Sequence, residues 1–176
     1  MKTMLASLLL ILSFAAQAQN TKPVTLRSNL LDQLHSTHDQ KDWFVTIDAA
    51  VQGVSADQAN WNDGKGNHSV GQLAYHLWFW NRRELMKFKG EPEEKFSGKN
   101  DETFTNFDKK SWDDTVKNLD QVMKDLEKFV ETADDATLQK WAPEIARLGT
   151  HNAYHLGQIV FVRREQGSWN PENGVK

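Results

Sequence analysis

The strongest constraint on the fold is an apolar stripe in the third quarter of the chain. Six large apolar residues follow one another at alternating spacings of four and three: Trp112, Val116, Leu119, Met123, Leu126 and Val130. This spacing places them on one face of an α-helix, and the opposite face is charged. Such a helix stabilises itself by packing its apolar face against other helices. The stripe therefore predicts a helical bundle.

Two further helices are expected before the stripe. Residues 26–51 form the first, because apolar residues recur along one side of it at helical spacing. A loop rich in Asn, Asp and Gly follows over residues 55–68. The second helix is expected to start at Ser69, which forms a capping box with Gln72. It continues to Lys89, where the following glycine and proline end it.

The helix that carries the stripe is expected to begin with Ser111 as its cap. The last helix is predicted to start near Pro143, since proline suits the first turn, and to end at Gln166 before a glycine. Residues 91–110 connect the second and third helices as a polar crossover, which either carries function or spans a distance. The predicted fold is all-α: a four-helix bundle with a long crossover between helices 2 and 3.

The N-terminus has the three-part pattern of a secretory signal peptide. Lys2 supplies a positive start, residues 5–16 are almost wholly apolar, and Ala16-Gln17-Ala18 is a small-x-small cleavage site. An uncleaved anchor or a buried first helix is the alternative. We expect residues 1–18 to be removed and residues 19–176 to form the bundle domain. The mature protein is then exported, periplasmic or secreted, and no later segment is suited to cross a membrane.

Composition excludes several kinds of site and partner. The chain has no cysteine, so any metal ligands must be nitrogen or oxygen donors. A net charge of -3 argues against nucleic acid as a partner. No phosphate-binding loop, nucleophile elbow or His-Glu-x-x-His protease motif is present. The sequence leaves a homodimer open and does not identify a small-molecule substrate.

Histidines are the residues most suited to chemistry in this chain. His151 and His155 lie four residues apart on one helix face, together with Leu148 and Ile159, and so are expected to point toward the core. Buried imidazoles need partners for their nitrogens. A metal ion satisfies both rings when they are neutral, and a hydrogen-bonded core pair is the alternative.

A third histidine favours the metal. His76 shares the inward side of the second helix with Leu73 and Trp80, so it can meet the other two in the bundle interior. Three nitrogen donors with one open position are typical of a catalytic divalent ion. His38 is a candidate for the pocket or for the shell around the ligands. Gln158 is expected to hydrogen-bond a bound water or ligand, or else to form a helix–helix contact. His35 is expected to be solvated, and His68 to lie in a loop.

Two segments of the chain resemble a known family. Asn60-Trp61, together with residues 68–77 (HSVGQLAYHL), is similar to the first signature of the DinB/YfiT-like metalloenzymes. Residues 151–160 (HNAYHLGQIV), followed by Arg163-Arg164, resemble the second. The resemblance extends over nearly all of the mature chain. It implies a four-helix bundle that binds zinc, nickel or a similar divalent ion, with ligands at the positions of His76, His151 and His155.

The family resemblance also implies a chemistry. Characterised members include thiol-dependent transferases and isomerases that use bacillithiol or mycothiol, in which the metal would lower the pKa of a bound thiol. Those relatives work in the cytoplasm, whereas the predicted signal peptide places this chain outside it. Water is then the more available nucleophile.

Three functions are consistent with these observations. The first is a metal-dependent hydrolase or transferase of small molecules, in which the catalytic residues are unknown and Gln158 or His38 orients the ligand. The second is a non-catalytic metal- or ligand-binding helical module. The third is a structural bundle whose histidines are hydrogen-bonded.

Overall fold

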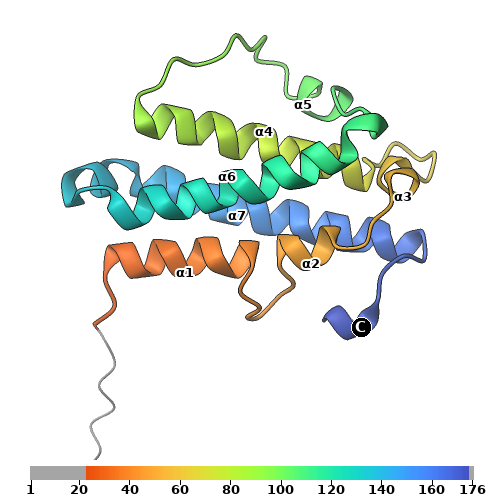
Figure 1. Cartoon of the computed structure of the whole chain (residues 1–176), viewed down its shortest axis with the longest axis horizontal. Helices are drawn as coiled ribbons and strands as arrows, with labels where there is room; N and C mark the ends of the chain where they lie inside the picture. Colours follow the sequence, from red (N-terminus) through yellow and green to blue (C-terminus); the bar gives the residue numbers. More distant parts are fainter. Residues whose placement is uncertain (1–22, 175–176) are drawn as a thin grey trace, which may run out of the picture.

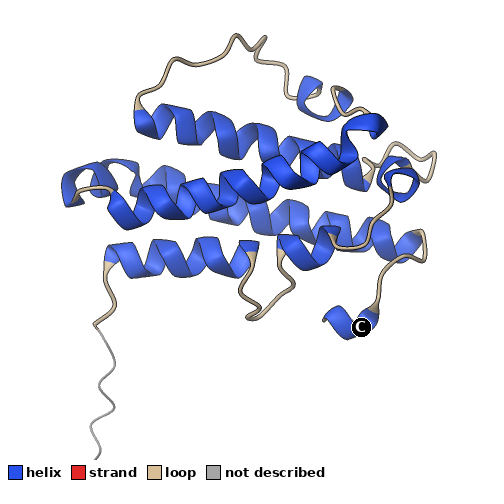
Figure 2. Ribbon diagram, viewed as in Figure 1, coloured by secondary structure: helices blue, strands red, loops and turns tan. Residues whose placement is uncertain are grey.

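A computed structural model describes residues 23–174, so the predicted signal peptide lies outside the described range. The described part of the chain is helical and contains no strand (Figures 1 and 2). Helix α4 packs against two helices of the bundle, α6 and α7, and α1 packs against the same two. The predicted all-α four-helix bundle is confirmed. Its members are α1 (Leu26–His38), α4 (Val70–Lys89), α6 (Trp112–Thr132) and α7 (Asp135–Glu165).

Helix α6 carries the apolar stripe into the core as predicted. Val116 is half-buried, and the other five stripe residues are buried. Ser111 occupies the cap position, but its side chain does not cap the helix. The Ser111 hydroxyl donates instead to the Asp108 carbonyl at 2.7 Å.

The first predicted helix is wrong as a continuous element, because the chain forms two helices over residues 26–51. Helix α1 ends at His38, and α2 (Ile47–Val51) begins after Thr46, whose side chain accepts from the Ala49 N–H. The segment between them begins with four polar residues, 39–42, and places Trp43 in solvent, 93% exposed. Helix α2 follows α1 along the same side of the bundle (Figure 1), and both pack against α7, so apolar residues continue at similar spacing across the break.

Helix α4 has the predicted boundaries. Ser69 Oγ accepts from the Gln72 N–H, and Gln72 Oε1 accepts from the Ser69 N–H, so the capping box is formed. Gly90 ends the helix in the left-handed conformation, with φ +70°. The loop expected before α4 contains the short helix α3 (Ala56–Asn60), which has a capping box of its own.

Helix α7 begins earlier than predicted, because Asp134 and not Pro143 marks its start. The Asp134 side chain accepts from the Thr137 N–H, and Pro143 lies inside the helix. An interior proline removes one backbone hydrogen bond and costs about 3 kcal/mol. Burial of Leu138 and Ile145 on either side of Pro143 offsets this cost, so the helix continues through it.

The crossover between α4 and α6 is partly folded. It contains α5 (Glu102–Thr105) and a 3-10 turn, η1 (Lys109–Ser111); a second such turn, η2 (Pro171–Asn173), follows α7. The Phe107 ring rests directly on the α4 backbone at Gly71, where an added Cβ would lie 2.2 Å from Phe107 Cζ. This close approach requires glycine and holds the crossover against α4.

A buried amide pair joins α4 to α7. Asn81 Nδ2 donates to Asn152 Oδ1 at 2.7 Å, and Asn152 Nδ2 donates back to Asn81 Oδ1 at 3.0 Å. Both side chains are fully buried. The reciprocal bonds fix the register of the two helices that carry the histidines, since a shift along either axis would leave buried amide groups without partners.

Candidate metal centre

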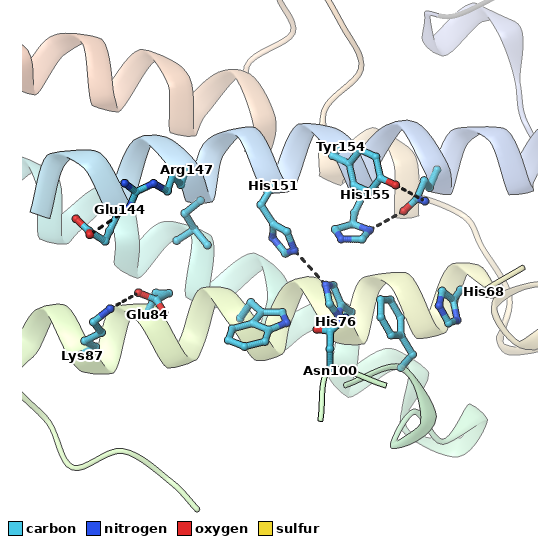
Figure 3. A pocket seen from close by; sticks show the side chains of 14 residues that line it. His68, His76, Glu84, Lys87, Asn100, Glu144, Arg147, His151, Tyr154 and His155 are labelled. Carbon is cyan, nitrogen blue, oxygen red and sulfur yellow. Dashed lines mark hydrogen bonds and ion pairs between the residues drawn. The ribbon is translucent and has the colours of Figure 1, made fainter. Parts of the chain in front are cut away.

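The three histidines predicted to converge do so between α4 and α7 (Figure 3). His76 Nε2 lies 3.1 Å from His151 Nε2. The His155 ring centroid is 4.5 Å from the centroids of both His76 and His151. One ring nitrogen from each residue lies within 4.8 Å of the others. The arrangement therefore supports a three-nitrogen site contributed by two helices.

The outer nitrogens of two rings are held by oxygen acceptors. His76 Nδ1 lies 2.6 Å from Thr103 Oγ1, and the Thr103 hydroxyl itself donates to the Asn100 carbonyl at 2.6 Å. The hydroxyl must then accept the proton of His76 Nδ1. His155 Nδ1 donates in the same way to Gln158 Oε1 at 2.6 Å. Both rings thus keep Nε2 unprotonated, which is the form of this atom that a metal needs.

His151 is held differently. Its Nδ1 is buried and is one of two such side-chain atoms without a hydrogen-bond partner in the described range. The ring is half-buried on α7, with only its Nε2 bonded, toward His76. A buried imidazole nitrogen without a partner raises the free energy of the site in either tautomer. The orientation of this ring therefore depends on its neighbours in the centre.

All three rings are neutral near neutral pH. Burial, and then repulsion from His155 and His151, lowers the pKa of His76 to about 3. Burial, and then repulsion from His155, lowers the pKa of His151 to about 4. Burial also lowers the pKa of His155, against the effect of its hydrogen bond to Gln158. Neutral imidazole is the form that binds metal ions.

An aromatic ring from the crossover covers one side of the centre. The Phe104 ring stacks on His76 at 4.0 Å between centroids and on His68 at 3.8 Å, so it lies between the two imidazoles. Thr103 and Phe104 belong to α5, which shows that the crossover brings residues to the site. Neither residue was predicted from the sequence. His68 lies in a loop as predicted, and its ring lines the site.

A cavity of about 760 Å³ opens beside the three histidines. Its size falls in the range of small-molecule sites, roughly 300–1,000 Å³. Two ion pairs lie at one end, Glu84–Lys87 from α4 and Glu144–Arg147 from α7, each at 3.2 Å (Figure 3). The rest of the cavity, near the three histidines and past them, is lined by aromatic residues: His68, Trp80, Phe104 and Tyr154.

The remaining candidates fall in different places. Gln158 lines the cavity and bonds to His155 on its own helix, so it forms no helix–helix contact through that oxygen. His38 does not line the cavity but lies fully buried beside Glu127 and Asp120. His35 is half-buried, and its Nδ1 lies 3.4 Å from Asp39 Oδ1.

The residues present fit a bound divalent ion. Two nitrogens that each lie about 2.1 Å from one ion are roughly 3–3.5 Å apart, which matches the His76–His151 separation of 3.1 Å. Three neutral imidazoles suit zinc, nickel and similar first-row ions. The described residues also include other groups with metal-ligating side chains, but only this one consists of histidines alone.

The fold and the site together define a helical-bundle protein with a candidate three-histidine metal centre. The sequence profile of the DinB superfamily matches residues 45–161, a range that includes all three histidines. The chain therefore belongs to the DinB superfamily. Comparison with curated proteins and with solved structures gave no match.

Proposed function

We propose that this DinB-superfamily chain is an exported protein that binds one divalent ion at His76, His151 and His155 and hydrolyses a small molecule there. The observation that carries the proposal is the convergence of three neutral imidazoles beside a cavity of about 760 Å³. When bound, the ion would act as a Lewis acid and lower the pKa of a nucleophile such as water or a thiol.

The protein's own residues prepare the site. Thr103 and Gln158 hold the outer nitrogens of His76 and His155, so these two ligands are oriented before any ion arrives. Phe104 shields one face of His76 from water by stacking on it. Such pre-organisation lowers the cost of fixing ligand geometry when the ion binds.

The cavity supports a substrate with an apolar part and a charged part. Trp80 and Tyr154 offer ring surfaces near the histidines, whereas Lys87 and Arg147 offer cationic groups at the far end. Both cations already have a carboxylate neighbour, which favours substrates with charges of both signs or with groups that bridge the two pairs.

Water is the nucleophile that the predicted location favours. The N-terminal pattern of a signal peptide supports export, and the export proposal rests on that pattern alone. Thiol transfer, the chemistry of characterised relatives, depends on low-molecular-weight thiols that are abundant in the cytoplasm. No helix among residues 23–174 has the length and apolar character of a membrane span.

Metal analysis of the untagged protein is the first test. We expect wild type to retain zinc or nickel at this centre and His76→Ala to lose it while circular dichroism shows an intact bundle. His68→Ala is the matched control, because its ring lines the cavity but stacks on Phe104. Unchanged metal content in His76→Ala would show that the ligand set is wrong.

A turnover screen tests the catalytic half of the proposal. Metal-loaded wild type would be assayed against esters, amides, and thiols paired with electrophiles, with His151→Ala as the inactive reference. Hydrolysis that needs added metal supports the proposal. Thiol transfer without hydrolysis would overturn the choice of nucleophile. Failure of every class, with the ion bound, favours the non-catalytic binding module.

A further inference from the structure

A second polar cluster lies where α1, α2 and α6 meet. His38, at the end of α1, is fully buried. Its Nδ1 lies 2.7 Å from Glu127 Oε1, and its Nε2 faces two carboxylates, Asp120 Oδ1 at 3.1 Å and Asp48 Oδ1 at 3.8 Å. Each of these acidic residues comes from α2 or α6, so the ring connects three separate helices.

The contacts of His38 favour a positive charge on its ring or beside Nε2. A neutral imidazole has one N–H and one lone pair. Glu127 accepts the N–H of Nδ1, which leaves the Nε2 lone pair directed at carboxylate oxygens. Two acceptors at 3.1 Å repel each other unless a cation lies between or beside them. Either a second proton or a metal ion meets this requirement.

Nearby charges leave room for such a cation. Asp120 uses its other oxygen, Oδ2, to pair with Lys124 Nζ at 2.7 Å, so Oδ1 stays directed at the ring. Asp48 pairs with His38, and Glu127 also lies 3.4 Å from His35 Nδ1. Three carboxylates therefore lie near His38, whereas a single lysine, Lys124, pairs with one of them.

The geometry also fits a metal ion. His38, Asp48 and Asp120 each offer one ligand atom within 4.8 Å of the others. An imidazole that donates its second N–H to a carboxylate is the usual arrangement of a metal-bound histidine, and Glu127 supplies that carboxylate. Asp48 and Asp120 line an open cavity of about 790 Å³, which gives a hydrated ion a path to the cluster.

We propose that His38, Asp48 and Asp120 form a second divalent-cation site, with Glu127 as the positioning residue of His38. One nitrogen and two carboxylate oxygens suit zinc or manganese, and they distinguish this site chemically from the three-histidine centre. The bound ion links α1, α2 and α6 and thereby holds α2 against the other two helices. This inference does not depend on the proposed function of the other centre.

Zinc titration of chelator-stripped protein tests the second site. A His76→Ala/His151→Ala variant removes two ligands of the first centre and isolates the second. Wild type is expected to bind two ions and the double variant one, measured by calorimetry and elemental analysis. Adding Asp48→Asn should weaken the remaining ion at least about tenfold. Asp120→Asn serves as a second test, and Asp113→Asn, which is exposed and lines the same cavity, should bind like its parent.

The outcomes separate the two centres. A folded double variant that binds no zinc overturns the second site, as does a bound ion that Asp48→Asn and Asp120→Asn leave unchanged. Loss of the ion in Asp113→Asn would show non-specific binding to surface acids and would also overturn it. If wild type binds one ion that Asp48→Asn removes and the double variant keeps, the second site stands and the three-histidine centre fails.

Discussion

The Thr103 hydroxyl determines which nitrogen of His76 faces the cavity. It accepts from Nδ1 and is fixed in that role by its own bond to the Asn100 carbonyl. Removing the acceptor frees the ring to rotate or to change tautomer, and both changes cost metal affinity. Thr103 therefore acts on metal binding through His76, because it bonds Nδ1, the ring nitrogen that faces away from the other two histidines.

Thr103→Val is expected to weaken metal binding about 10–100-fold, since it keeps the side-chain shape but removes the acceptor. Affinity would be measured by competition with a chromophoric chelator. Thr103→Ser retains the hydroxyl and should bind nearly as wild type does. Equal affinity in the valine variant would show that packing alone orients His76.

The Asn81–Asn152 pair makes a different prediction, on stability. Asn81→Ala leaves a buried amide of Asn152 without its partner and should lower the free energy of unfolding by about 2–3 kcal/mol. Replacing both residues should cost less than the sum of the single changes, because neither partner is then stranded. Urea unfolding measures the cycle, with the exposed Asn118→Ala as control. Strict additivity would contradict a coupled pair.

Residues on regular helices were predictable, whereas residues on the crossover were not. His76, His151 and His155 share faces with apolar neighbours, so their inward direction follows from helical spacing. Thr103 and Phe104 lie in a polar segment without a sustained apolar period, and nothing local marks them as site residues. The partners of His38 were missed for a related reason: they come from other helices, and only the folded chain brings them together.

At the scale of elements, helix ends were predicted where the cap is written in adjacent residues. Ser69 with Gln72 determines the start of α4, and glycine determines its end. Pro143 misled the prediction of α7 because proline favours a first turn, yet tertiary burial carried the helix through it. The break between α1 and α2 was hidden because both helices pack against α7 and Val45, between them, is also buried, so the apolar spacing continues across the break.

The Asp134 cap makes the stability of α7 depend on pH. Its hydrogen bond from the Thr137 N–H lowers the pKa of this carboxyl below the ordinary value of 3.8. A lowered pKa means that the stabilisation is present above pH 3.8 and is lost as the pH falls through the pKa of the folded state. The advantage of wild type over Asp134→Ala in urea midpoint should therefore be largest near neutral pH.

Urea midpoints of both proteins between pH 3 and pH 7 would measure this trend, because the ordinary aspartate pKa of 3.8 lies within this range. The exposed Asp114→Ala, in the first turn of α6, controls for the loss of one acidic residue. If the urea midpoint of Asp134→Ala stays below that of wild type by the same amount across this range, the carboxylate charge does not act at the cap.

At the scale of the whole molecule, an ion at the three-histidine centre would join α4 to α7. A ligand present at about 100 times its Kd stabilises the folded state by about 2.7 kcal/mol, which corresponds to a Tm shift of roughly 5–10 °C for a chain of this size. Chelation should lower Tm by this amount. His76→Ala should reduce the Tm difference between the metal-loaded and the chelated protein, and His68→Ala should leave that difference as it is in wild type. An unchanged Tm in chelated wild type would argue against a tightly bound ion.

The missing side chain at Gly71 has a consequence for how the centre can be damaged. Phe107 rests in the space that a methyl group would fill, and the same stretch of chain presents Thr103 and Phe104 to His76. A side chain at position 71 would force the Phe107 ring to move, and a shift of this covering segment would loosen the contact that Thr103 makes with a coordinating ring. The ion would then be lost because of a change at a residue whose side chain cannot bind a metal. Gly71 lies more than one helical turn from the nearest histidine of the centre.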